Sequence, residues 1–402
     1  MGIYKDLGLE PIINASGPVT RLGGAPMPPD VLRAMHDAAQ EAVPLERLQA
    51  SASRRIAALT GTEAGLVTAG CAAALTLAAA AVIARSDPAR MQMLPQTDGF
   101  PSEFVIAREQ RSGYDHAVRA AGAKLVEVGF NEVVANAGVR RTEAWEYEAA
   151  FGPQTAGVVY VYFPGSQPPL AEVVARAHAR NLPVIVDAAG ELPPRSNLKS
   201  IAATGADLVA FSGGKAIRGP QSTGILCGRR DLVGSAALQM LDMDDHYDLW
   251  DPPTELFDKN RLPGMPRHGI GRGMKVSKEQ IAGLLTALDL FASGAYGSDT
   301  ATFRTDLETI ARGLEGAATS SAILDADDSE TAPLLEIRLD ERTIGRTAFD
   351  VCRALREGSP PVYVGHGKLA DGVLLINPLC LRSGDAAVIA RRLREIVDNA
   401  CP

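Results

Sequence analysis

The sequence predicts an α/β protein in which a large domain with a mostly parallel sheet is followed by a smaller α+β domain. Its 402 residues exceed what one hydrophobic core usually organises. Through the middle of the chain, short β-branched runs alternate with amphipathic helical runs, which is typical of parallel βαβ layering. Hydrophobic residues make up 46% of the chain and charged residues 22%, as in ordinary globular proteins. We therefore expect a folded chain of two domains.

The expected elements of the large domain alternate along the chain. Helices are expected at residues 114–121 and near 170–180. Strands are expected at residues 104–106, 124–128, 157–161, 183–187, 207–212 and 223–227. The runs at 183–187 and 207–212 are mostly apolar, which favours buried parallel strands. The first of them ends in Asp187, and the second leads into Ser212-Gly213-Gly214-Lys215.

The pattern changes after residue 244. Residues 244–272 are rich in Pro, Gly and charged residues, and this stretch is too irregular for one element and too long for an ordinary connection. We expect a functional or domain-bridging loop there. A helical period covers 278–292, and short strands and helices resume from about residue 300, as at 334–338 and 386–397. The smaller domain is therefore expected to begin near residue 276.

The charge balance disfavours a nucleic-acid partner. The formal net charge is −8, and no stretch is dense in Lys and Arg. A protein that binds DNA or RNA needs a basic surface to neutralise phosphates. We expect a small-molecule substrate and no nucleic acid.

Cysteine spacing and hydropathy favour a cytoplasmic protein without a metal. The five cysteines form no CxxC pair and no metal-ligand spacing, so we expect free thiols. The N-terminus has no charged segment followed by an apolar one, as a signal peptide would. Residues 66–84 carry no charge and match a membrane span in length, but alanine dominates them and Thr68-Ala69-Gly70 interrupts them. We expect a buried helix there and no membrane partner.

Lys215 follows a buried strand through a Gly-Gly turn. Open α/β sheets bind ligands at their carboxyl edge, and a flexible turn there can bring a lysine amine against a flat ring. A surface lysine after a turn is the alternative interpretation.

Asp187 ends an apolar strand, which would bury its carboxylate unless a cation pairs with it. Capping of a following helix is the alternative role. Asp187 and Lys215 lie 28 residues apart, which is the length of one strand–helix–strand unit. Parallel neighbouring strands would place both residues at the same sheet edge.

Thr68, Gly70 and Cys71 precede the Ala-rich run. Their backbone N–H groups would lie at a helix N-terminus, where the helix dipole and unpaired donors favour a phosphate. A glycine before any helix looks similar, so this signal is weak alone. A phosphate loop, an acid and a lysine are together what pyridoxal 5'-phosphate (PLP) requires. We predict PLP as the cofactor, with Lys215 as the Schiff-base lysine and Asp187 beside the pyridine nitrogen.

A set of motifs is spread along the chain, at residues 13–17, 20–24, 121–129, 187–189, 212–215, 219–221 and 271–276. In these motifs the chain resembles the selenocysteine synthase-like (L-seryl-tRNA selenium transferase-like) family of fold-type I PLP enzymes, which includes D-glucosaminate-6-phosphate ammonia-lyases. The resemblance covers nearly the full length.

This resemblance implies an aspartate aminotransferase-like fold and an assembly based on a homodimer, either a dimer or a higher homo-oligomer, with shared active sites. It also implies an N-terminal arm, residues 1–45, that packs on the small domain, a large PLP-binding domain at 46–275 and a small domain at 276–402. Selenium transferases carry an additional N-terminal tRNA-binding region and a basic surface, whereas this chain begins near the arm sequence and is acidic. The small-molecule ammonia-lyases are therefore the better analogue.

Weaker candidates complete the expected cofactor site. His116 is placed to stack on the pyridine ring, with Tyr114 as the fallback, and a histidine at a helix start is the alternative role of His116. Ser212 would add a phosphate contact from its hydroxyl or cap the turn.

Several arginines are candidates for binding the anionic groups of the substrate. Arg382 lies in the region from which many fold-type I enzymes bind a substrate carboxylate, although a surface salt bridge would explain it equally. Arg21 and Arg272 are further candidates, as are Arg218 and Arg267. The sequence does not rank them.

The expected reaction begins with removal of the substrate Cα proton by the Lys215 amine. Elimination of a Cβ leaving group would give a 2-oxo acid and ammonia, and the resemblance favours this outcome. An amino-acid racemase or epimerase, an aminotransferase and an aldolase remain alternatives on the same scaffold. A selenium transferase acting on aminoacyl-tRNA and a non-catalytic protein are less favoured.

Overall fold

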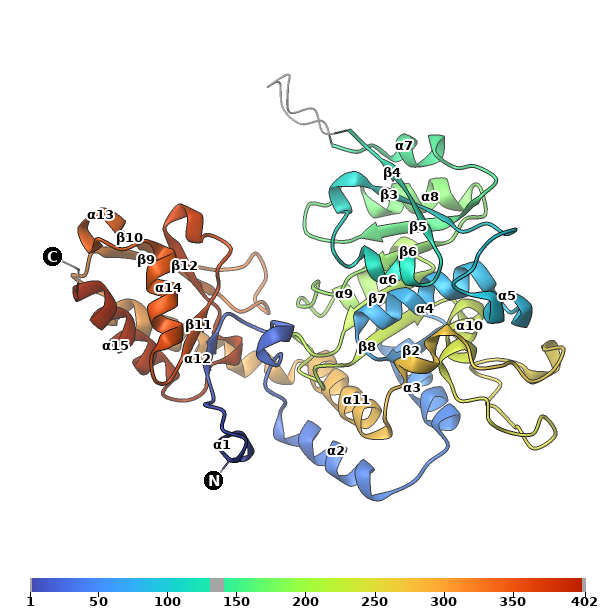
Figure 1. Ribbon diagram of the computed structural model, residues 1–402, viewed down its shortest axis with the longest axis horizontal. Helices are drawn as coiled ribbons and strands as arrows, with labels where there is room; N and C mark the ends of the chain where they lie inside the picture. The colour runs from blue at the N-terminus through green and yellow to red at the C-terminus, as the bar shows by residue number, and fades with distance from the viewer. Residues whose placement is uncertain (1, 131–140, 400–402) are drawn as a thin grey trace. The chain divides into compact units, whose positions relative to one another are not determined.

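The computed structural model describes residues 2–130 and 141–399 of the chain (Figure 1). Its contacts divide the chain into two compact units. The larger unit is Met27–Ala292, and the smaller one combines Met1–Pro26 with Ser293–Pro402. The N-terminal residues therefore share a unit with roughly the last quarter of the chain.

A seven-stranded sheet forms the centre of the larger unit, with the strand order β2-β8-β7-β6-β5-β3-β4. Strands β4, β3, β5, β6 and β7 run parallel to one another, whereas β8 runs antiparallel to both β7 and β2. The strands are β2 (Ala64–Thr68), β3 (Glu103–Ala107), β4 (Lys124–Val128), β5 (Thr155–Val161), β6 (Val184–Asp187), β7 (Leu208–Ser212) and β8 (Gly224–Gly228). This mostly parallel sheet confirms the predicted α/β class.

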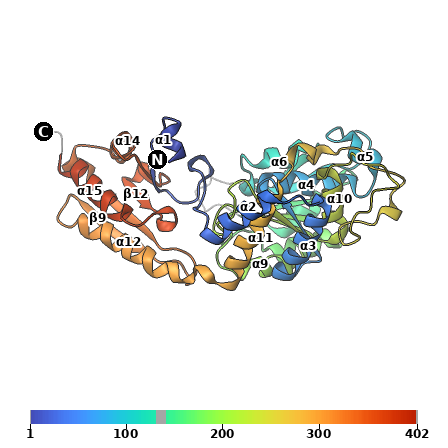
Figure 2. The same ribbon diagram turned by 90° about the horizontal axis from the view of Figure 1, so that it is seen from below.

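Helix α4 (Cys71–Ala84) is the central helix of this unit. It is buried along Ala73–Ala84 because its small alanine side chains let it pack closely on β6, β7 and β8. Helices α6 and α10 also pack against it (Figure 2). The uncharged run at 66–84 is thus a buried strand followed by a buried helix. Among the described residues, no helix combines the length and apolarity needed to cross a membrane.

The remaining helices of the larger unit surround this core or lead into it. They are α2 (Pro29–Gln40), α3 (Leu45–Thr60), α5 (Pro88–Met93), α6 (Asp115–Ala120), α7 (Ala144–Ala149), α8 (Leu170–His178), α9 (Asn197–Ser200), α10 (Arg230–Met240) and α11 (Lys278–Ser293). Within the irregular region expected at 244–272, the chain forms a 3-10 turn at Lys259–Arg261. A second 3-10 helix, Ile270–Met274, ends it.

The smaller unit contains a three-stranded antiparallel sheet in the order β12-β10-β9 and a two-stranded parallel pair, β1 with β11. Its helices α12 and α15 lie side by side, as Figures 1 and 2 show. Its elements are α1 (Ile3–Asp6), β1 (Ile13–Ala15), α12 (Asp299–Gly313), β9 (Thr319–Leu324), β10 (Leu334–Leu339), α13 (Glu341–Ile344), α14 (Ala348–Glu357), β11 (Val362–Val364), β12 (Val373–Ile376) and α15 (Asp385–Asp398).

Candidate active site

Three strand ends meet in one row at an edge of the seven-stranded sheet. Gly224, at the start of β8, is paired with Thr68 at the end of β2 and with Ser212 at the end of β7. The phosphate-loop candidate that follows Thr68 and the lysine turn that follows Ser212 are therefore both at this edge. The antiparallel direction of β8 produces this arrangement, because the start of β8 lies between the carboxyl ends of its two neighbours.

Asp187 lies at the same edge. Strands β6 and β7 are adjacent and parallel, with Asp187 opposite Ala210, as the spacing of 28 residues predicts. The backbone N–H of Ala188 continues this pairing by donating to the carbonyl of Ala210 at 3.0 Å. Asp187 and the turn that carries Lys215 therefore extend from neighbouring strand ends.

The Asp187 carboxylate is largely enclosed and has no cationic side chain in contact with it in the described part of the chain. Its Oδ1 accepts a hydrogen bond from the backbone N–H of Ala189 at 3.0 Å and a longer one from the Cys71 thiol at 3.8 Å. Burial raises the pKa of Asp187, an effect that the Ala189 hydrogen bond and the charge of Lys215 oppose. A protonated pyridine nitrogen would supply the missing cation, so this carboxylate fits PLP.

The phosphate-loop candidate is a tight turn into α4. The Thr68 hydroxyl donates to the Gly70 carbonyl at 3.0 Å, and Gly70 has a φ of +87°, a conformation that glycine adopts without strain. The first N–H to bond into the helix is that of Ala74, which donates to Gly70. The N–H groups before Ala74 in this 14-residue helix are thus available to an anion.

Gly224 supports this loop from behind. A Cβ built on Gly224 would lie 2.4 Å from the carbonyl carbon of Gly70 and 2.6 Å from the backbone nitrogen of Cys71. Only a residue without a side chain lets the strand approach the loop so closely. Gly224 could not be selected from the sequence, because its role depends on this long-range contact.

The turn that carries Lys215 is closely packed. Gly213 and Gly214 are both buried, and a Cβ on Gly214 would lie 2.5 Å from the Cα of Gln221. The Gly213 N–H donates to the Thr223 carbonyl at 2.9 Å, and the Gly219 N–H donates to the Gly213 carbonyl at 2.8 Å. A flexible Gly-Gly turn was expected here, whereas in the structure the two glycines permit close packing against the Gln221–Thr223 segment.

Lys215 is half-buried between two acidic positions. Its charge acts on both Asp187 and Glu191, and a Cβ built on Gly190 would lie 3.5 Å from its Nζ. The Nζ makes no hydrogen bond or ion pair within the described residues. Sequence reasoning missed Glu191, because an acid in a loop after a strand is common and only the fold brings this loop close to Lys215.

His116 and Tyr114 line a shallow groove of about 310 Å³ next to the start of α4, together with Ala72, Ala73 and Met274 among others. Helix α6, which carries His116, is held against α4 by a hydrogen bond of 2.7 Å from the Thr76 hydroxyl to the Ala117 carbonyl. Both predicted stacking residues are exposed. The groove places them near the phosphate-loop candidate.

The predicted anion-binding arginines occupy different surroundings. Arg272 donates to Asp242 at 2.5 Å and lines a separate cavity of about 170 Å³ in the larger unit. Arg267 is exposed, whereas Arg218, with a φ of +60°, lies in the lysine turn. In the smaller unit, the Arg21 guanidinium lies 5.6 Å from the ring centre of Tyr363, and Arg382 is exposed just before α15.

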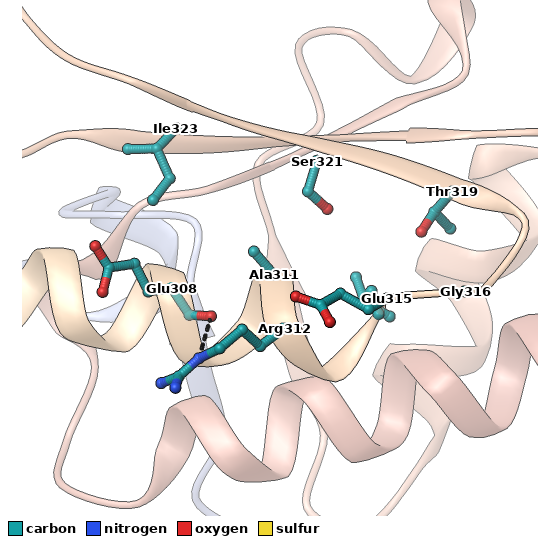
Figure 3. A pocket seen from close by; sticks show the side chains of 9 residues that line it. Glu308, Ala311, Arg312, Glu315, Gly316, Thr319, Ser321 and Ile323 are labelled. Atoms are coloured by element: carbon teal, nitrogen blue, oxygen red, sulfur yellow. Dashed lines mark hydrogen bonds between the residues drawn. The ribbon is translucent and has the colours of Figure 1, made fainter.

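A groove of about 450 Å³ in the smaller unit contains none of these candidates (Figure 3). Glu308, Arg312 and Glu315 lie on its α12 side, and Thr319, Ser321 and Ile323 lie on its β9 side. The Arg312 Nε donates to the Glu308 carbonyl at 3.3 Å. Two carboxylates beside one guanidinium do not suit an anionic cofactor.

Comparisons with known proteins identify the family of this chain. The family model of aminotransferase class-V matches residues 30–242. D-glucosaminate-6-phosphate ammonia lyase of Salmonella typhimurium is 29% identical over 99% of this chain and 98% of its own length. A 5'-C-glycyluridine monooxygenase-decarboxylase of a Streptomyces species is 33% identical over 98% of this chain and 92% of its own. An L-seryl-tRNA(Sec) selenium transferase of Rhizobium meliloti is 31% identical over 56% of this chain and 50% of its own.

Solved structures of known proteins share the fold of this chain. A structure of D-glucosaminate-6-phosphate ammonia-lyase has a TM-score of 0.81 and 28% identity, covering 100% of this chain and 99% of its own. The cysteine desulfurase CsdA of Escherichia coli, with a TM-score of 0.54 and 16% identity over 93% of both chains, shares the fold. The family match over more than half of the residues and the full-length relatives confirm the resemblance stated from the sequence. The chain belongs to the aminotransferase class-V family of fold-type I, PLP-dependent enzymes.

Proposed function

We propose that this enzyme is a lyase that removes a Cβ hydroxyl or comparable leaving group and the Cα proton from a small polar amino acid, giving a 2-oxo acid and ammonia. The observation that supports the proposal is the Asp187 carboxylate, which lies at the same sheet edge as Lys215 and forms no ion pair within the described residues. The full-length likeness to an ammonia lyase supports this reaction over others on the scaffold. An amino sugar acid is the substrate class that this likeness favours.

We assign the cofactor contacts to residues of the larger unit. The N–H groups at the start of α4, with Thr68, Gly70 and Cys71, would hold the phosphate, and Ser212 would add its hydroxyl. His116 would cover the ring, and Asp187 would hold a proton on the pyridine nitrogen. PLP bound there supplies an electron sink that stabilises negative charge at the substrate Cα.

Lys215 then acts as the base. Its amine is half-buried, has no protein partner in the described residues and is held by a turn whose glycines cannot accept a side chain without displacement. A fixed amine beside the Cα of the substrate can remove the Cα proton without competing hydrogen bonds. We propose Arg21, Arg272 and Arg382 as binding residues for the anionic groups of the substrate. Arg272 must release Asp242 to serve in this way.

In the direct test, the enzyme is incubated with L-serine, D-serine or D-glucosaminate 6-phosphate, each carrying deuterium at Cα. Release of ammonia together with a 2-oxo acid supports the proposal. Elimination, racemisation and transamination all remove the deuterium, whereas retro-aldol cleavage leaves it in the substrate that remains. Formation of the enantiomer alone, with neither ammonia nor a 2-oxo acid, would replace the lyase with a racemase and leave Lys215 and Asp187 in their roles.

A second candidate function is oxidative decarboxylation of an amino acid, because the Streptomyces relative, a monooxygenase-decarboxylase, matches this chain at 33% identity over 98% of its length. The two candidates differ in their need for oxygen. Ammonia release that continues under anaerobic conditions supports the lyase. Carbon dioxide release that requires oxygen supports the oxidative reaction.

We also propose that the enzyme is a homodimer, or an assembly of such dimers with shared active sites, and that it acts in the cytoplasm without a nucleic-acid partner. The family resemblance supports the assembly, and the net charge of −8 disfavours an RNA substrate. Light scattering of the purified protein tests the oligomeric state, and a binding assay with total tRNA tests the absence of a nucleic-acid partner.

A further inference from the structure

Glu191 is a second acid beside Lys215. It lies four residues after Asp187, on the loop that leaves β6, and its side chain is half-buried. The preceding residue, Gly190, is so close to Lys215 that a Cβ built on it would lie 3.5 Å from the lysine Nζ. Burial raises the pKa of Glu191, the charge of Lys215 opposes this, and the charge of Asp187 adds to it.

The Glu191 side chain forms no polar interaction that would hold the fold of the described residues. Its carboxyl group makes no hydrogen bond or ion pair within the part of the chain that the structure describes. The loop is held by the backbone instead, since the Glu191 N–H donates to Ala188 at 3.2 Å and its carbonyl accepts from Asn197 Nδ2 at 2.8 Å. A half-buried acid with no polar partner among the described residues is a candidate for function.

The cofactor does not account for Glu191 either. PLP requires one acid at the pyridine nitrogen, and Asp187 meets that requirement. The reaction, however, has two proton transfers. While Lys215 accepts the Cα proton, the departing hydroxyl needs a proton from elsewhere, because hydroxide is a poor leaving group.

We propose that Glu191 is the general acid that protonates the departing Cβ hydroxyl, an inference that rests on the proposed elimination. The Cα–H bond breaks and its proton passes to the Lys215 amine. The electron pair left at Cα forms the Cα–Cβ double bond as the Cβ–O bond breaks. The oxygen takes the pair of that bond and the proton of Glu191, and it leaves as water. A raised pKa suits the task, because it keeps the carboxyl protonated at a higher pH than a solvated glutamate.

The test compares two leaving groups in Glu191→Gln, which keeps the shape of the side chain but cannot donate an acidic proton. Serine and D-glucosaminate 6-phosphate lose a hydroxyl, whereas β-chloroalanine loses chloride, which needs no proton. We expect ammonia release from the hydroxyl substrates to fall at least about 100-fold. Release from β-chloroalanine is expected to stay within about threefold. Glu172→Gln, at an exposed acid on α8, is the matched control and should leave both unchanged.

Two further measurements separate this role from a structural one. The absorbance of the lysine-bound cofactor and the affinity for PLP should match the wild type in Glu191→Gln, and the variant should still exchange the Cα proton of serine with deuterated solvent. In the wild type, the rate with hydroxyl substrates should fall as the pH rises through the raised pKa of Glu191, while the rate with β-chloroalanine does not.

The outcomes distinguish this inference from the function on which it rests. Equal losses with both leaving groups, or loss of proton exchange, would overturn the role of Glu191 while the elimination stands. A wild-type enzyme that releases ammonia from none of the three substrates would overturn the elimination itself and this role with it.

Discussion

Replacing Gly224 with alanine is expected to weaken PLP binding through a backbone collision. The new Cβ would lie 2.4 Å from the Gly70 carbonyl carbon and 2.6 Å from the Cys71 nitrogen, whereas ordinary contacts begin near 3.4 Å. Both atoms belong to the backbone, so rotation of a side chain cannot relieve the contact. The phosphate-loop candidate must therefore move away from β8 by about 1 Å.

The size of the effect follows from the two costs of that movement. Overpacking in a core typically costs about 1–3 kcal/mol of folding free energy, which we expect as a lower melting temperature. A loop displaced by about 1 Å also loses or weakens at least one hydrogen bond to the phosphate, and bonds to charged groups are worth about 1.5–3 kcal/mol. That range corresponds to roughly 10- to 150-fold weaker binding of PLP.

The assay is titration of the cofactor-free protein with PLP, followed by absorbance of the lysine-bound cofactor, alongside thermal unfolding. Gly152→Ala is the control, because a Cβ there meets nothing within 4 Å. An affinity for PLP in Gly224→Ala within twofold of the wild type would refute the placement of the phosphate next to Gly70 and Cys71.

Four other predictions concern the assigned roles. Lys215→Ala should abolish the borohydride-reducible link to PLP, and peptide mapping that finds the cofactor on another lysine would contradict the assignment. Asp187→Ala should lower turnover by about 100-fold or more, equivalent to about 3 kcal/mol, with far less effect on folding. Burial raises the pKa of Asp187 in the folded protein. The cofactor-free protein should therefore lose stability as the pH rises from the pKa of an unfolded aspartate, about 3.9, through the raised pKa of the folded state. Asp187→Asn should flatten that loss of stability in denaturant melts, and an unchanged pH dependence would contradict this prediction. Arg382→Ala should raise KM about 10- to 100-fold with little change in kcat if this side chain binds the substrate carboxylate, whereas an unchanged KM would remove Arg382 from the site.

The strand ends at Asp187 and before Lys215 could be predicted from the sequence because both follow local rules. An apolar run of strand length that ends in a polar residue indicates a buried parallel strand, and the spacing of the two residues indicates neighbouring strands. The combination of acid, lysine and phosphate loop then indicated PLP. These inferences needed no knowledge of which distant residues come into contact.

Tertiary structure decided what depends on distant parts of the chain. The antiparallel direction of β8 places Gly224 against Gly70, 154 positions away in the numbering, and β1 pairs with β11 almost at the other end of the chain. The role of Gly213 and Gly214 was also decided by tertiary structure. Their packing shows that they let the backbone of a neighbouring segment approach closely. Hydrophobic periodicity reports which face of an element is buried, but it does not report the neighbour that covers that face. For the same reason Glu191 looked like any loop acid until the fold placed its loop beside Lys215.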